Sequence, residues 1–275
     1  MLWIMMAIII TIGLFGKALN QHHERENARK SIALVYRLLE LLRLLQQHSH
    51  VLHQQLTHHD KSDHNRQVIE KRLITLIASC CQESPKTYRA MFRILSTRIA
   101  EICTDNRVLT TTKNHYLHSK ATRHALYLID ELLSQALIHQ EKTALLGAYQ
   151  KQWQLTLECL DSLAKFRSSL IAISDCNNAN QFSHLPRLRH QAHLTFLRLR
   201  KLLDEQTDSY AGYVTLLDEL QHVANPDQPY IEPHEIYQLS ARISSCSISV
   251  FTFSLKRVCR SVLTVDNKIT RFTPA

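Results

Sequence analysis

The sequence predicts an all-α fold: one N-terminal transmembrane helix followed by about eight helices in two packed four-helix bundles. The 275-residue chain has only four glycines and six prolines, too few for a turn-rich β protein. Apolar residues make up 45% of it, enough for a buried core. Segment after segment repeats its apolar residues at steps of three and four, which is the spacing of one helix face.

The first element is the predicted membrane anchor, at residues 1–19. Met1 to Gly16 is apolar apart from Thr11, and Lys17 can extend its charge to the interface, so the span can reach Leu19. No positive n-region or small-residue cleavage site suggests a cleaved signal peptide. The basic residues all follow the span, which places the body in the cytoplasm by the positive-inside rule. We expect a single-pass protein of the inner (plasma) membrane.

The body, residues 27–262, is expected to be one helical domain, and its first half holds four helices. The inward positions of the first, from Asn27 to about Leu56, are Ile32, Val35, Leu39, Leu42, Leu45, Ser49, Leu52 and Leu56. A shorter helix places Ile69, Leu73, Leu76, Ile77 and Cys80 inward. Ser84–Pro85 supplies a cap and a first-turn proline for the third, which buries Tyr88, Met91, Phe92, Leu95 and Ile99. After a polar connection at Thr104–Asn114, the fourth buries Ala121, Ala125, Leu128, Leu132 and Ala136.

The second half is expected to hold four more helices. The first of these runs from about Lys142 to Ser174, and Pro186 opens the next, with Leu188, Ala192, Phe196, Leu199 and Leu203 inward. A short helix follows on Tyr213, Leu216, Leu220 and Val223. After the proline-rich loop Asn225–Pro233, the last helix extends to about Val262, with Ile236, Leu239, Ile243, Cys246, Val250 and Phe253 inward. Its stretch Ser247–Phe253 also alternates like a strand. Residues 263–275 are expected to form a flexible tail.

Arg167 is the most informative single residue of the body. It falls on the stripe Trp153, Leu157, Leu160, Ala164, Arg167, Ile171, which a helix would bury. A guanidinium stays charged inside a protein, so it needs a carboxylate, a group of carbonyls or a bound anion beside it. The alternatives are an anion-binding site and an arginine that pairs with Asp161 or Glu158 or reaches solvent.

Other classes of function find little support in the sequence. The net charge of +9 is spread among acidic residues, so we expect no nucleic-acid partner. Seven scattered cysteines suit a reducing compartment. His50 and His53 have metal-ligand spacing but no completing ligand, so we expect no metal site and no cofactor. No constellation of catalytic residues is recognisable, and the chain is not expected to be an enzyme.

Several segments resemble the nitrate- and nitrite-sensing (NIT) domain family. The helix with Leu38–Leu39–Glu40–Leu41–Leu42–Arg43–Leu44–Leu45–Gln46–Gln47–His48–Ser49–His50 is similar to the family's first, leucine-rich helix. Ala125–Leu133, Gln152–Arg167 and Tyr230–Tyr237 resemble three later segments. The resemblance implies a bacterial sensor with paired helical bundles that hold a small oxyanion, nitrate or nitrite, between arginines of both. It also implies a homodimer whose helices shift on binding.

The resemblance assigns a ligand-binding role to Arg167, the position of the second-bundle arginine. Ser49 stands where the first-bundle arginine belongs, and His50 where a glycine belongs. Losing one guanidinium removes a charge and a bidentate donor from the site. Ser49 is still a candidate ligand, and His48 or His53 could donate in place of the arginine when protonated. No output domain is recognised after the last helix, so the signal is expected to leave through the membrane helix, a dimer interface or a separate output protein.

Two functions compete. The first is a membrane-anchored sensor of the nitrate- and nitrite-sensing type, with its anion binding altered or lost. The second is a membrane-anchored helical scaffold that binds a protein partner and no small ligand. The second predicts that Arg167→Leu is tolerated, because replacing a buried charge by an apolar side chain is often neutral when no ligand depends on it.

Overall fold

The computed structural model describes residues 2–58, 63–104, 110–174, 181–205, 211–227 and 232–264. Within them the protein is an all-α helical bundle, as predicted. The helices are α1 (Leu2–His58), α2 (Asp63–Glu83), α3 (Arg89–Thr104), α4 (Thr111–His139), α5 (Thr143–Ser174), α6 (Gln181–Asp204), α7 (Ala211–Ala224) and α8 (Pro233–Thr264), with a short 3₁₀ helix at Lys86–Tyr88 before α3. Ser247–Phe253, where the sequence also alternates like a strand, is helical.

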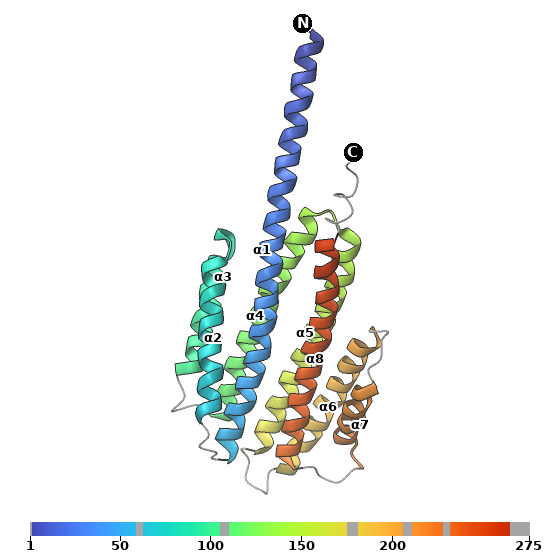
Figure 1. Cartoon of the computed structure of the whole chain (residues 1–275). Helices are drawn as coiled ribbons and strands as arrows, with labels where there is room; N and C mark the ends of the chain where they lie inside the picture. The colour runs from blue at the N-terminus through green and yellow to red at the C-terminus, as the bar shows by residue number, and fades with distance from the viewer. Residues whose placement is uncertain are drawn as a thin grey trace.

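Two apolar clusters form the core. The first joins α1 to α4 with the N-terminal part of α5 and the C-terminal half of α8, and the second joins α5 to α8. α1 packs against α2 and α4, whereas α5 packs against α6 and α8, and further contacts of α1 with α8 and of α4 with α5 connect the two groups. Figure 1 shows these helices side by side, roughly along one axis.

α1 is longer than expected because the predicted anchor and the first body helix form one continuous helix. Its N-terminal part projects well beyond the other helices (Figure 1). No helix among the described residues is both long enough and apolar enough to cross a membrane. Within residues 1–19, only Trp3, Met6, Thr11, Phe15 and Lys17 have described side chains, so the anchor stays a prediction. The predicted tail from Val265 onward lies outside the described residues.

The inward positions expected from the periodicity agree with the structure in most helices. Every expected position from Ile32 to Leu52 in α1 is buried, and so is every expected position in α4. Phe253 was expected inward but is 47% exposed. It lies on the face of α8 that lines the cavity described below.

Three predicted helix starts need correction. The Ser84 hydroxyl donates to the Cys81 carbonyl of the preceding helix and does not cap α3. Thr110, inside the predicted connection, is the true N-cap of α4, because its hydroxyl accepts from the Lys113 N–H. α6 begins at Gln181, so Pro186 lies inside its second turn and does not open it.

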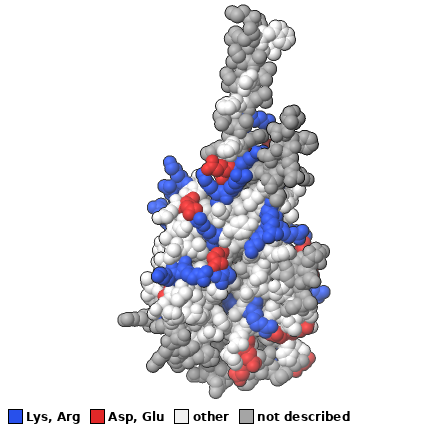
Figure 2. Space-filling view, in the orientation of Figure 1, with Lys and Arg blue, Asp and Glu red and all other residues white. Residues whose placement is uncertain are grey.

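Charged side chains are mixed over the surface. Figure 2 shows Lys and Arg across much of the described face, with Asp and Glu between several of them. Pairs such as Arg242 with Glu219 on α8 and α7 follow this pattern.

Candidate functional site

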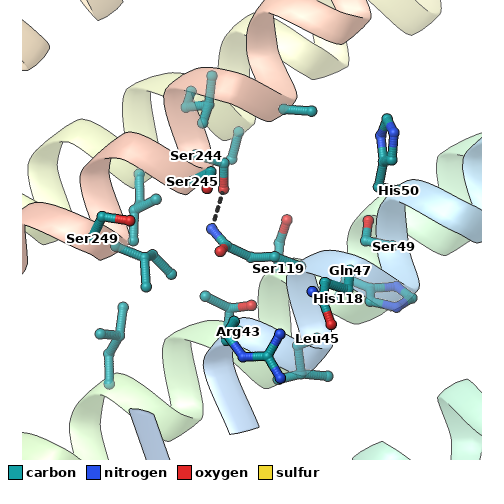
Figure 3. Close-up of a pocket in the computed structure, with 18 of the residues that line it drawn as sticks. Arg43, Leu45, Gln47, Ser49, His50, His118, Ser119, Ser244, Ser245 and Ser249 are labelled. Carbon is teal, nitrogen blue, oxygen red and sulfur yellow. Dashed lines mark hydrogen bonds between the residues drawn. The ribbon is translucent and has the colours of Figure 1, made fainter. Parts of the chain in front are cut away.

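A cavity of about 1110 Å³ lies between α1 and α4 on one side and α5 and α8 on the other. Arg167 and Ser49, two of the residues expected to bind a ligand, both line it. They come from helices separated by more than a hundred positions in the chain. Figure 3 shows Ser49 and His50 of α1 beside His118 of α4, with the serines of α8 across the open space.

Arg167 can face this cavity because α5 has two apolar faces. The fully packed face lies in the second cluster and consists of Leu155, Cys159, Leu163, Phe166, Leu170 and Ile173. The stripe predicted as the buried seam is a different one. Ile171 at its end is buried, but Trp153, Leu157, Leu160, Ala164 and Arg167 are only partly buried. Leu157, Leu160, Ala164 and Arg167 line the cavity. The charge therefore lies on a cavity wall and not in a packed core.

Ser240 of α8 is the hydrogen-bond partner of Arg167. The guanidinium Nε lies 2.9 Å from Ser240 Oγ, and Nη2 lies 2.8 Å from the Ser240 carbonyl oxygen. Among the described carboxylates, none forms an ion pair with Arg167. The two acids considered as partners are bound elsewhere: Asp161 pairs with Arg123, and Glu158 pairs with Arg198 at 2.5 Å.

The uncompensated charge has an electrostatic cost. Burial lowers the pKa of the Arg167 guanidinium below its usual range, because the low-dielectric surroundings disfavour the charged form. An arginine still keeps its proton in a protein. The site therefore holds a cation whose energy would fall if an anion bound beside it.

The aromatic ring of Tyr237 contacts both Arg167 and His53. The Arg167 Cζ lies 5.7 Å from the centre of the Tyr237 ring, within the range of a cation–π contact. The His53 ring stacks on the same ring, with centroids 3.2 Å apart. Burial raises the pKa of the Tyr237 phenol, although Arg167 and a hydrogen bond with Ser49 oppose this. His53 therefore supports Tyr237 and is not among the residues that line the cavity.

His48 also lies behind the cavity wall and does not line it. It is fully buried, with Nδ1 2.9 Å from His118 Nε2 and Nε2 3.1 Å from a Glu70 carboxylate oxygen. His118 Nδ1 in turn lies 2.8 Å from the Asn114 carbonyl oxygen. His118, which the sequence analysis did not select, is the ring that reaches the cavity.

Two further histidines line the cavity beside Arg167. Burial, reinforced by the positive charge of Arg167, lowers the pKa of His50 and lowers the pKa of His115 to about 4. His115 Nε2 lies 3.4 Å from the Ala164 carbonyl. The His50 Nδ1 atom is buried without a partner among the described residues. Near neutral pH His115 is therefore uncharged, and Arg167 supplies the positive charge at this end of the cavity.

No family model, curated protein or solved structure matches this chain. Within the described part of the chain, no three His, Cys, Asp or Glu side chains are grouped as metal ligands would be. The function is therefore inferred from the cavity itself.

Periodicity could have located some of the missed site residues. The inward positions of α4 begin at Ala121 and Ala125, and steps of three and four carried backward reach His118 and Asn114, both buried. Tyr237 and Ser240 of α8 flank the expected inward positions Ile236 and Leu239. Their proximity to Arg167 carries no sequence signal, because 73 positions separate Ser240 from it.

Proposed function

We propose that this protein is a helical sensor that binds an anion at Arg167, in the manner of the nitrate- and nitrite-sensing domains. The observation that carries the proposal is a mostly buried guanidinium that lines a cavity and has no carboxylate partner among the described residues. A charge in such a position is destabilising unless something compensates it, and an anion is the simplest compensating ligand.

The arrangement of the helices supports this proposal. α1 to α4 and α5 to α8 would correspond to the two packed four-helix bundles that the resemblance implies. Arg167 comes from the second group and Ser49 from the first, and both line the cavity between them. A ligand held there would contact both groups, so its binding would favour one relative position of the groups over another.

The remaining parts of the proposal concern how a signal leaves the domain. We propose that residues 1–19 anchor the protein in a bacterial inner membrane, with the body in the cytoplasm. The protein would act as a homodimer or through a separate output protein. The continuous α1 helix supports this, because it connects the proposed anchor directly to the wall of the cavity.

Titration calorimetry of the full-length protein in detergent with nitrate and nitrite tests the proposal. We expect saturable binding in the wild type and in Arg93→Met, which removes an exposed arginine of α3. Binding should be lost in Arg167→Met. Saturating anion should also raise the melting temperature, since a ligand that binds only the folded state stabilises it.

The contrary result would favour the scaffold function. In that case the titration would release no heat, and millimolar anion would leave the melting temperature unchanged. The Arg167→Leu variant would be as stable as the wild type. The exposed apolar side chains that a scaffold would use are distributed over several helices, including Ile74, Ile94, Tyr127, Leu197 and Val214.

A further inference from the structure

The cavity is much larger than an inorganic oxyanion requires. Its volume of about 1110 Å³ is slightly above the roughly 300–1,000 Å³ of sites that bind drug-sized organic ligands. An ion the size of nitrate bound at Arg167 would leave most of this space to water. The remaining walls can therefore indicate which kind of molecule would fill it.

Arg167 presents a defined edge to such a ligand. A guanidinium has five N–H donors, and Ser240 accepts one from Nε and one from Nη2. The Nη1 donors and the second Nη2 donor have no partner among the described residues. The free Nη1–Nη2 edge matches the two oxygens of a carboxylate, which arginine binds through paired hydrogen bonds.

This end of the cavity can bind one anionic group. The other arginines that line it are already paired: Arg43 with Glu40, Arg123 with Asp161, and Arg242 with Glu219. Lys256 also lines the cavity, but it is exposed and lies sixteen residues beyond Ser240 in α8, about 24 Å along the helix axis. His115, which lines the cavity beside Arg167, is neutral near pH 7 because its pKa is about 4. The rest of a ligand that extends away from Arg167 would therefore be uncharged.

Uncharged polar side chains line the cavity beyond Arg167. They come from three helices and include Gln47, Ser119, Thr122, Ser245, Ser249 and Thr252. Ser245 and Ser249 make no hydrogen bond within the described residues, whereas the nearby Ser247 donates to the carbonyl four residues before it. Figure 3 shows Ser245 and Ser249 on one side of the open space, with Gln47 and Ser119 on the other. These groups can bind hydroxyls from two sides.

Leucine and isoleucine side chains complete the walls. Leu126, Leu157, Leu160 and Ile248 line the same cavity. A polyhydroxylated carbon chain or ring exposes C–H groups as well as hydroxyls. It can therefore bury its C–H groups on the leucines while its hydroxyls bond to the serine and glutamine side chains.

We infer that the cavity binds a polyhydroxylated organic carboxylate of the sugar-acid type. The carboxylate lies on the free edge of Arg167, and the hydroxylated body extends between the serines of α8 and the polar side chains of α1 and α4. This inference rests on the proposed anion-binding function and specifies the ligand class of the same site.

Calorimetry of the full-length protein with matched probes tests the inference. Gluconate and galacturonate carry the carboxylate and the hydroxyls, acetate carries only the carboxylate, and glucose carries only the hydroxyls. We expect the better sugar acid to bind at least tenfold more tightly than acetate or nitrate, and glucose to give no measurable binding. Arg167→Met should abolish binding of the sugar acid.

A double variant tests recognition of the ligand's hydroxyls independently of recognition of its carboxylate. Ser245→Ala with Ser249→Ala changes two exposed helical positions that tolerate alanine. It should weaken sugar-acid binding about tenfold and leave acetate and nitrate binding unchanged. Ser168→Ala, at an exposed position of α5 that does not line this cavity, is the matched control and should change neither.

The outcomes distinguish the two proposals. Sugar acids that bind no more tightly than acetate, while nitrate or acetate still binds through Arg167, would overturn the ligand class and leave the anion-binding function in place. Sugar-acid binding that Arg167→Met does not weaken would also overturn the inference. No binding of any anion would overturn both proposals.

Discussion

The imidazole rings of His48 and His118 are joined by a buried hydrogen bond, with 2.9 Å between His48 Nδ1 and His118 Nε2. His118 Nδ1 bonds to the Asn114 carbonyl oxygen, which can only accept. His118 Nδ1 therefore carries a hydrogen and donates it. Burial lowers the pKa of His118 to about 3; the ring is therefore neutral and its Nε2 accepts. His48 Nδ1 must be the donor.

The other nitrogen of the His48 ring contacts α2: His48 Nε2 and a Glu70 carboxylate oxygen are 3.1 Å apart. Arg66 of α2 lies 3.4 Å from the same carboxylate oxygen. The chain of hydrogen bonds connects α2, α1 and α4 behind the cavity wall.

The first prediction concerns the coupling of His48 with His118. His118→Leu leaves the His48 Nδ1–H without an acceptor, which should lower the free energy of unfolding by about 1–3 kcal/mol. In the His118→Leu background, His48→Leu should lower the free energy of unfolding by less than it does in the wild type, because the hydrogen bond between the two rings is already lost. Urea denaturation of the two single variants and the double variant gives the coupling energy. Strictly additive losses would contradict the shared bond, and the exposed His139→Leu is the control.

The second prediction is a loss of stability in mild acid. Burial holds the folded-state pKa of His115 at about 4 and that of His118 at about 3, whereas an unfolded histidine has a pKa of about 6.5. The unfolded state therefore binds more protons below pH 6.5. Each histidine should lower the free energy of unfolding by about 1.4 kcal/mol per pH unit as the pH falls from about 6.5 toward its folded pKa.

Denaturation at pH 6.5, 5.5 and 5.0 measures this slope. His115→Phe should reduce this slope by the contribution of one histidine, and the exposed control His139→Gln should leave the slope unchanged. A free energy of unfolding that stays constant across this window would contradict the neutral, buried state of both rings.

The third prediction links Arg167 to the histidines of the cavity. Burial is the main cause that lowers the pKa of His50 and of His115, and the positive charge of Arg167 is the second. Arg167→Met should therefore raise both values, and an anion bound beside Arg167 should shift them in the same direction. By linkage, anions should bind more tightly as the pH falls. Histidine ring NMR titrations with and without nitrate measure the shifts; equal values in wild type and Arg167→Met would refute this coupling.

The fourth prediction restores the charge that the resemblance expects at position 49. Ser49 is 9% exposed and lines the cavity with Arg167, so Ser49→Arg would place a second guanidinium there. A charge-assisted hydrogen bond contributes about 1.5–3 kcal/mol, so nitrate should bind at least about tenfold more tightly. The free energy of unfolding without anion should fall because two like charges would be close together. Ser49→Met, of similar bulk without charge, should show no gain in nitrate affinity.

Local periodicity accounts for the part of the fold that the sequence predicted. The buried positions of α1 and α4 follow steps of three and four, and helix geometry alone turns that spacing into a single face. The same rule selected Arg167 as a charge at an apolar position. It was only partly right for α5, where two apolar faces compete. Phe166 and its neighbours are fully packed, whereas Leu157, Leu160 and Arg167 of the predicted stripe are partly buried and line a cavity.

The sequence by itself determined that this protein is helical, which faces of most helices are buried, and that one arginine interrupts an apolar stripe. Each of these depends on residues within a few turns of one another. Only the tertiary structure decided that Arg167 bonds to Ser240, that Ser49 lines the same cavity, and that His48 lies behind it against His118. Such pairs lie 70 or more positions apart, and packing between helices, which local spacing does not encode, brings them together.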